Sequence, residues 1–283
     1  LCVVVIVFGT TPLEPPTPFK RASPAVAYRQ SHCQCVCGAR EVEKPAKKKK
    51  FAMNELIVLN VGYSAMEERG EEVEGEMEVM VANCTCTLIK SHDCNIIVDT
   101  MTPWDGDLLL QRLQEHQLAP DDISWVVSTH GHSDHLGNNN LFLKARHIVG
   151  TNISQRNRYF IHDFTSAPFH LSDTIEVLAT PGHTLACVSL LVRNCTIRTT
   201  PGVPSSGPAR TVAIVGDLFE RAEDITDAAL WLEAGSEDPA AQRRNRARMA
   251  AAADFIVPGH GAGFAVTEAV RETLRGQVGE GGQ

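Results

Sequence analysis

A short run of metal-binding side chains is the most informative feature of this sequence. The run from Thr129 to His135 places four candidate ligands within six residues: His130, His132, Asp134 and His135. Zinc binds deprotonated nitrogen, sulfur or oxygen donors that lie close together. Because an apolar segment, 123–127, comes directly before the run, a strand that ends in a turn would aim these side chains at one point. The spacing predicts that His130 and His132 serve one metal ion and that Asp134 and His135 serve a second.

Three further donors follow apolar segments later in the chain. They are His183 after a Pro-Gly turn, Asp217 after the segment 211–215, and His260 after the segment 254–257. Ligand sites in α/β folds collect at the carboxyl ends of strands, so we expect these turns to converge on one cleft. The resulting assignment is one ion on His130, His132 and His183, a second ion on Asp134, His135 and His260, and Asp217 as the bridge between them.

This ligand set predicts a hydrolase. Two ions about 3.5–4 Å apart can clamp an attacking hydroxide and stabilise the charge that develops on the substrate. Binding to zinc lowers the pKa of water toward about 7, so hydroxide becomes available without a strong protein base. We therefore expect two Zn²⁺ per chain, with iron as the alternative metal, and a metal-bridging hydroxide as the nucleophile. Asp134 and Asp217 are the predicted catalytic carboxylates.

Composition limits the remaining possibilities. The chain has 283 residues, of which 43% are hydrophobic and 21% charged, as in an ordinary globular protein. Its formal charge of −8 gives no general attraction to polyanions, so any role with nucleic acid must rest on local charge and on the active site. The sequence contains no stretch of about 18 apolar residues, so no membrane-spanning helix is predicted. The nine cysteines, an odd number unevenly spread, indicate reduced thiols in a cytosolic or nuclear protein.

The chain divides into three predicted parts. Residues 1–52 include a proline-rich stretch and a basic run, 47–50, and are expected to be disordered or a non-native extension before Met53. The basic run is interpreted either as a solvated segment or as a nuclear-import or RNA-contact patch. Residues 53–275 are predicted to form a single hydrolase domain, and 276–283 a disordered tail.

Strands and helices are expected to alternate within the domain. Hydrophobic periodicity predicts strands at 56–61, 77–89, 95–99, 123–127, 174–178, 186–192, 211–215 and 254–257. Helices are predicted at 105–118, 238–253 and 266–274. Segments rich in glutamate (67–78) or in Thr, Pro, Gly and Ser (194–210) are predicted to be loops.

These features together resemble the metallo-β-lactamase superfamily. The run ending at His135 resembles its first motif, and Gly182-His183, Gly216-Asp217 and Pro258-Gly-His260 resemble the next three. The resemblance covers roughly 53–274 and implies an α/β fold, an αββα sandwich with the metals at one edge. His135 and Asp217 differ from the Arg and Cys of the main antibiotic-hydrolysing class, and they are similar to the glyoxalase II and ribonuclease Z branch.

The resemblance also implies a substrate. The compact plan, with Thr102-Pro-Trp104 early and Val257 to Gly261 late, resembles animal members of the superfamily. That likeness implies an endoribonuclease that trims histone pre-mRNA 3′ ends in cytosol and nucleus. A homodimer is one assembly to be tested. The alternatives are a glyoxalase II-like hydrolase of a small thioester or ester, a single-iron persulfide dioxygenase, and a non-catalytic scaffold.

Two sets of residues outside the ligand motifs are candidates for contact with substrate. The first is a basic cluster on the helix predicted at 238–253, which could meet phosphates or could simply be a solvated face. It consists of Arg243, Arg244, Arg246 and Arg248. The second comprises His162 and His170, which lie between the first motif and His183 and so could face a substrate.

Overall fold

The computed structural model describes residues 53–67, 79–198 and 207–279. The predictions for 1–52, including the basic run, lie outside the described residues, as does most of the predicted loop at 67–78. Among the described residues, no helix is long and apolar enough to cross a membrane.

Most strands belong to one continuous hydrogen-bonded sheet. The strands of the first half are β1 (Asn54–Asn60), β4 (Cys86–Lys90), β5 (Asn95–Val98), β6 (Trp125–Ser128), β7 (Arg146–Val149), β8 (Asn152–Gln155) and β9 (Arg158–Phe160). The second half contains β10 (Phe169–Ser172), β11 (Ile175–Ala179), β12 (Val188–Arg198), β13 (Arg210–Gly216), β14 (Phe255–Pro258) and β15 (Phe264–Ala265). The two halves join where β1 pairs in parallel with β12.

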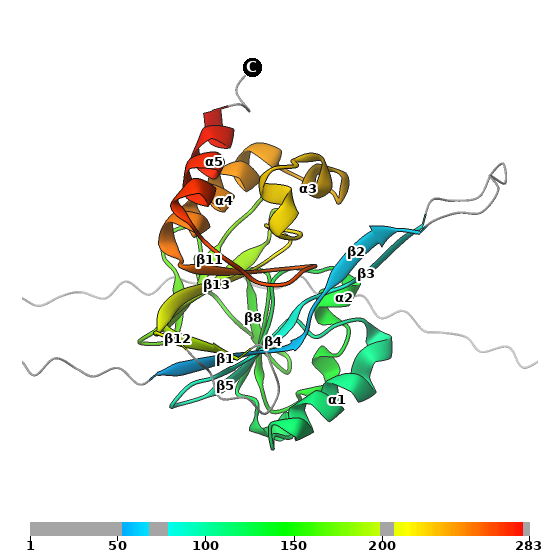
Figure 1. Ribbon diagram of the computed structural model, residues 1–283. Helices are drawn as coiled ribbons and strands as arrows, with labels where there is room; N and C mark the ends of the chain where they lie inside the picture. Colours follow the sequence, from blue (N-terminus) through cyan, green and yellow to red (C-terminus); the bar gives the residue numbers. More distant parts are fainter. Residues whose placement is uncertain (1–52, 68–78, 199–206, 280–283) are drawn as a thin grey trace, which may run out of the picture. The chain divides into compact units, whose positions relative to one another are not determined.

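Helices cover the outer face of each half. They are α1 (Gly106–Glu115), α2 (Ser133–Leu136), α3 (Ala229–Glu233), α4 (Pro239–Ala252) and α5 (Glu268–Gly279). Helix α1 buries Leu109 and Leu113, which lie one turn apart on the same face. Helix α4 begins where the Asp238 side chain accepts a hydrogen bond from the Ala241 amide at 2.8 Å. Figure 1 shows α1 beside the first half of the sheet and α3, α4 and α5 beside the second.

Three apolar clusters separate the four layers. The central cluster joins residues of both sheet halves, such as Val127 and Val257. A second cluster packs the first half, through Val126, against α1, and a third packs the second half, through Ile256, against α4 and α5. Neighbouring residues of one strand thus enter different clusters, because each strand is buried on both faces. This layering is the αββα arrangement, and it confirms the expected fold class.

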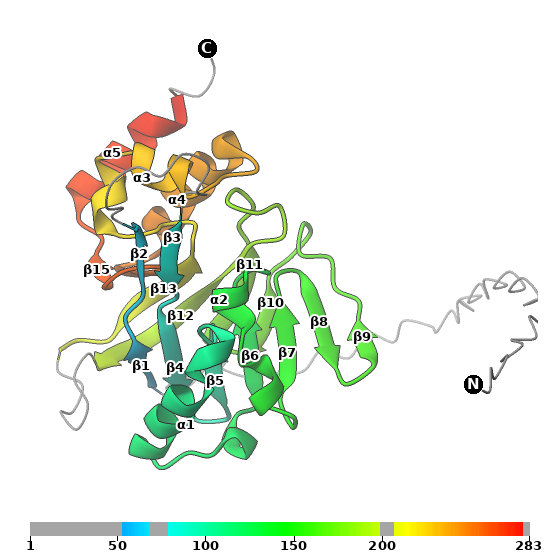
Figure 2. The same cartoon turned by 90° about the vertical axis from the view of Figure 1, so that its right-hand side faces the viewer.

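The carboxyl ends of several buried strands lie at one edge of the sandwich. Strand β5 is followed by Asp99, and β6 leads directly into the turn that carries the first motif. In the other half, β13 and β14 run in parallel and are followed by Asp217 and His260. Figure 2 shows β5 to β9 side by side with α2 at their upper ends. The fold therefore brings together donors that lie far apart in the sequence.

Several predicted elements differ from the structure. The strand predicted at 77–89 is two strands, because β3 (Met80–Asn83) leaves the main sheet and pairs with β2 (Tyr63–Met66). The break lies at Thr85, whose amide donates to Gly259 O instead of to a strand partner. The predicted loop at 194–210 begins too early, since β12 stays paired with β1 as far as Arg198. Helix α5 runs to Gly279, past the predicted domain end at 275.

Candidate metal centre

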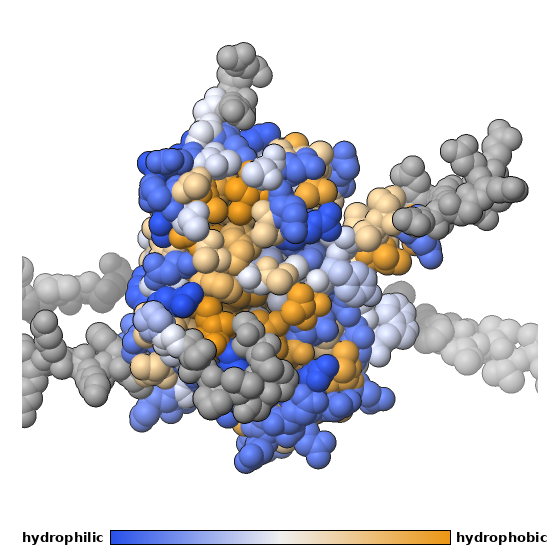
Figure 3. Space-filling view, viewed as in Figure 1, coloured by the Kyte–Doolittle hydropathy of each residue, from blue (hydrophilic) through white to orange (hydrophobic). Residues whose placement is uncertain are grey.

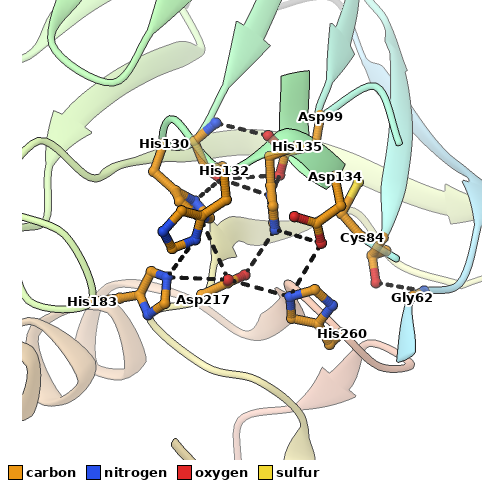
Figure 4. Close-up of polar contacts among 12 residues, drawn as sticks. Gly62, Cys84, Asp99, His130, His132, Asp134, His135, His183, Asp217 and His260 are labelled. Carbon is orange, nitrogen blue, oxygen red and sulfur yellow. Dashed lines mark hydrogen bonds and ion pairs between the residues drawn. The ribbon is translucent and has the colours of Figure 1, made fainter. Parts of the chain in front are cut away.

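The structure places the first three predicted ligands against one another. We call His130, His132 and His183 the first donor group. His132 Nδ1 lies 2.9 Å from His130 Nε2 and 3.1 Å from His183 Nε2. Three ring nitrogens therefore meet at one point, as the spacing predicted, although His183 comes from the other half of the sheet (Figure 4).

The second donor group consists of Asp134, His135 and His260. Asp134 Oδ2 lies 3.6 Å from His135 Nε2 and 3.7 Å from His260 Nε2. Asp134 and His135 are on the short helix α2, while His260 follows β14. The second predicted trio is thus assembled as well, beside the first.

Asp217 lies between the two groups. Its Oδ2 is 3.4 Å from both His130 Nε2 and His183 Nε2, and 3.2 Å from His260 Nε2. Its Oδ1 is 3.2 Å from His135 Nε2. One carboxylate therefore faces ligand nitrogens of both groups, which is the geometry expected of a bridging ligand (Figure 4).

The polar atoms of the centre fit metal ions better than they fit one another. Asp134 Oδ2, His135 Nε2 and Asp217 Oδ1 are buried and have no hydrogen-bond partner among the described residues. A buried polar atom without a partner costs about 1–3 kcal/mol. All three atoms point into the donor groups, where a divalent cation would satisfy them together. The imidazole nitrogens and carboxylate oxygens are also the donors that zinc prefers.

Asp99 orients His135 from behind. Its Oδ2 lies 2.9 Å from His135 Nδ1, and its Oδ1 accepts from the Thr129 amide at 2.7 Å. The Asp99 backbone has a φ of 58°, a conformation that Asp adopts more easily than most residues. Sequence reasoning missed this contact, although Asp99 ends a predicted strand beside the one that leads to His135, and that position was the available signal.

Backbone carbonyls orient two other histidines. His183 Nδ1 lies 2.6 Å from Gly235 O, and His260 Nδ1 lies 3.0 Å from Asn83 O. A ring nitrogen that donates to a carbonyl leaves Nε2 as the unprotonated ligand atom. Any residue carries a carbonyl, so no pattern in the sequence could identify these partners.

Two glycines are required by close packing at the centre. A methyl group at Gly259 would collide with Asp217 Oδ1. Gly216 has a φ of +53°, and a methyl group there would collide with the Thr129 side chain. Gly216 therefore lets the two halves of the fold approach closely, and Gly259 leaves room for the Asp217 carboxylate beside the turn that carries His260.

Burial and charge move the histidine pKa values in opposite directions. Burial holds the pKa of His130 well below its usual range, and it also lowers the pKa of His132. Burial disfavours the charged form of His260 too, but the Asp217 carboxylate outweighs this and raises its pKa to about 9. Burial likewise opposes the charged form of His135, yet Asp217 and Asp99 raise its pKa well above its usual range. Without a metal ion, His135 and His260 are therefore protonated more readily than His130 and His132.

A further acid, Glu220, lines the same cavity and was not identified from the sequence. Its side chain is buried, and its Oε2 accepts from Ser64 Oγ at 3.2 Å. Burial and the neighbouring Asp217 raise the pKa of Glu220 to about 8. The cavity has a volume of about 260 Å³, and the residues that line it include His132, Asp134, His183, Asp217, Glu220 and His260.

The other predicted substrate contacts are wrong or lack support in the geometry. Arg246 is fully buried and binds Asp224 Oδ1 at 2.7 Å, so it is a core residue that cannot meet a phosphate. His162 bonds to the Ala167 carbonyl, and His170 lies 3.8 Å from Glu176 Oε2. Neither histidine lines the cavity. Sequence periodicity could not separate Arg246 from its exposed neighbours because its buried acid comes from another element.

The fold and the donor set define a class, the metal-dependent hydrolases with two donor groups at the edge of an αββα sandwich. Residues 79–260 match the family model described as the metallo-beta-lactamase superfamily, and the chain belongs to that family.

Relatives among known proteins agree with this assignment. The chain is 42% identical over 212 residues to metallo-beta-lactamase domain-containing protein 1 of Xenopus laevis, covering 74% of the chain and 80% of the relative. Identity to the human protein of that name is 40% over 190 residues, covering 66% of the chain and 64% of the relative. A crystal structure of an N-acyl homoserine lactone hydrolase with product at its metal centre has a TM-score of 0.46 and 18% identity, covering 71% and 88%.

Proposed function

We propose that this protein is a dinuclear zinc hydrolase and that its substrate is RNA, cleaved at histone pre-mRNA 3′ ends in cytosol and nucleus. The position of Asp217 carries the hydrolase part of the proposal, since one carboxylate faces nitrogens of both donor groups at 3.2–3.4 Å. Two bound ions would supply a water of lowered pKa as nucleophile and would stabilise negative charge on the substrate.

The residues of the chain contribute orientation. Asp99 and the Gly235 and Asn83 carbonyls hold three imidazole rings so that each presents Nε2 to the centre. The cavity opens beside His132, the exposed member of the first donor group, so a substrate would enter from that side. We assign the catalytic roles to Asp134 and Asp217, which supply the negative charge of the predicted ligand set.

The RNA part of the proposal is supported by the resemblance to compact animal members of the family, which implies endoribonuclease activity. Two-ion sites suit displacement at phosphorus, because both the attacking and the leaving oxygen need stabilisation. The formal charge of −8 and the burial of Arg246 leave phosphate recognition to the metals.

Hydrolysis of a small thioester or ester is the second candidate. A cavity next to the metal cavity has a largely apolar lining that includes Met66, Met80 and Leu230, and both cavities share Ser64, Met80 and Ala234. Figure 3 shows apolar surface on the β2–β3 hairpin, which supplies the two methionines. Partial matches to an N-acyl homoserine lactonase and to a protein named glyoxylase B2 agree with such a substrate.

The test compares three substrates on one metal-analysed sample of the protein: a histone pre-mRNA 3′ fragment, a glutathione thioester and a β-lactam. We expect cleavage of the RNA, two zinc ions per chain, and loss of cleavage in Asp134→Asn, which keeps the shape of the side chain. The matched control is Asp93→Asn, because Asp93 is an exposed acid that pairs with His92.

The outcomes separate the candidates. Turnover of the thioester without RNA cleavage would replace the first candidate by the second. A single iron per chain would favour the persulfide dioxygenase chemistry instead. Full activity in folded Asp134→Asn would overturn the two-ion mechanism itself.

A further inference from the structure

Glu220 carries a buried carboxylate at the metal centre and is not one of the seven predicted ligands. It follows Asp217 by three residues, at the end of the turn after β13, and only 2% of its surface is exposed. Its backbone is fixed on both sides, since its amide donates to Asp224 Oδ2 and its carbonyl accepts from the His260 amide, each at 2.8 Å. The side chain is therefore held on the cavity wall by the backbone.

The Glu220 carboxylate lies within ligand distance of the second donor group. Its Oε2 is 3.9 Å from His260 Nε2, the atom that also approaches Asp217 Oδ2 at 3.2 Å. Ligand atoms of Asp217, Glu220 and His260 all lie within 4.8 Å of one another. Atoms that bind one ion at about 2.0–2.2 Å are separated by up to roughly twice that length, and the distances from His260 Nε2 to Asp217 and to Glu220 both meet this condition.

No basic side chain among the described residues pairs with this acid alone. The side chain of Glu220 contacts the Ser64 hydroxyl and His260, and His260 already faces Asp217 and Asp134. Three carboxylates thus share the surroundings of one imidazole in a buried site. Burying charge without compensation is costly, whereas a divalent cation between these groups would satisfy them all.

We propose that Glu220 is an additional ligand of the ion held by the second donor group. This ion would then have three carboxylates, Asp134, Asp217 and Glu220, beside two imidazoles, whereas the first donor group offers three imidazoles. Oxygen-rich sites suit harder ions such as Mn²⁺, and nitrogen-rich sites suit Zn²⁺. The second position is thereby adapted to a harder ion than the first. This inference rests on the proposed two-ion centre.

Ser64 links this ligand to the β2–β3 hairpin. Its hydroxyl donates to Glu220 Oε2 at 3.2 Å, and its carbonyl accepts from Arg221 Nη1 at 2.8 Å. The hairpin thus holds the same Glu220 oxygen, Oε2, that lies 3.9 Å from His260 Nε2. Removing the hydroxyl in Ser64→Ala should weaken metal binding less than removing the carboxylate itself.

The experiment titrates metal-free protein with Mn²⁺ and follows free Mn²⁺ by its electron paramagnetic resonance signal, with zinc stoichiometry measured separately by mass spectrometry. We expect Glu220→Gln to lower Mn²⁺ affinity at one site by at least about 10–100-fold, the effect of losing an outer partner of a metal site. Zinc at the first donor group should be retained. Glu233→Gln is the matched control, since Glu233 lines the neighbouring cavity and belongs to no donor cluster.

A second variant tests the inference if the first variant does not fold. If Glu220→Gln does not fold by circular dichroism, Glu220→Asp keeps the charge but shortens the reach by one methylene, and it should also lose Mn²⁺ affinity. Unchanged Mn²⁺ affinity in a folded variant overturns the inference. Failure of the proposed function has a different signature, namely a single metal ion per chain or no RNA cleavage by wild-type protein, and neither result depends on Glu220.

Discussion

The two donor groups lie side by side but differ in chemistry and in support. The first group presents three imidazole nitrogens, and its His132 is exposed to solvent. The second combines Asp134 with two buried histidines, each fixed from behind, His135 by Asp99 and His260 by the Asn83 carbonyl. The first group therefore resembles an open coordination site, whereas the second is a closed and more acidic one.

The two donor groups also differ in the pKa values of their histidines. Neighbouring carboxylates raise the pKa values of His135 and His260, while burial lowers the pKa values of His130 and His132. A metal must therefore displace protons from His135 and His260 more than from His130 and His132. The two positions are thus expected to differ in pH dependence and in metal preference although Asp217 connects them.

Replacing the bridge should produce the largest effect. Asp217→Asn removes the charge that both groups share, so we expect hydrolysis to fall by at least about 10²-fold, the usual loss when one stabilising group leaves an active site. Metal content should fall at both positions. Steady-state kinetics and metal analysis of the same sample measure this, and retention of two tightly bound ions would show that the groups are independent.

Asp99 offers a way to perturb one group alone. Asp99→Asn keeps the size of the side chain and tolerates the positive φ, but it weakens the orientation of His135. We expect a loss of about 10–100-fold in affinity at the second group and little change at the first. Competition with a chelator would measure both affinities, with Asp93→Asn as the control. An equal loss at both positions would contradict the comparison.

The pH dependence of metal binding should differ between the groups. At pH 7 the metal-free His260, with a pKa of about 9, carries a proton that the metal must release, and His135 behaves in the same way. Affinity at the second group should rise about tenfold per pH unit for each proton released, until pH passes 9. Affinity at the first group should change little between pH 7 and 9. Calorimetry in buffers of different ionisation enthalpy counts the protons.

The same shift predicts a change in stability. The pKa of His260 is raised in the folded protein, so the stabilisation it gives metal-free protein is complete below about pH 6.5 and is lost as pH rises through 9. Thermal unfolding of metal-free protein should therefore occur at lower temperature at pH 9.5 than at pH 6.5. His260→Gln should flatten this dependence, and an unchanged slope in that variant would assign the effect to other groups.

The smallest effect is expected outside both groups. His170→Gln changes an exposed side chain whose partner is Glu176, away from the cavity, so activity should stay within about twofold of wild type. Kinetics on the same substrate would measure it. A large loss would mean that the substrate extends to β10, beyond the two donor groups.

The sequence alone predicted the fold class and identified the seven candidate ligands. Local patterning made this possible, because strand periodicity, glycine turns and donors at strand ends are all properties of short segments. The same reasoning missed β7 to β10, where short strands carry weak alternation. It also joined β3 and β4 into one strand, because the chain stays extended through Thr85 while its pairing partner changes.

The roles of Asp99, Glu220 and Arg246 were decided only by tertiary structure. Each is a charged residue whose meaning depends on a partner far along the chain: His135 for Asp99, His260 for Glu220, and Asp224 for Arg246. Periodicity indicates which face a residue occupies but not which charge it meets there. The sequence therefore determined which residues make up the metal centre. Packing across the two sheet halves decided how its two donor groups differ, because contacts between distant segments set the burial of each group and the charges around it.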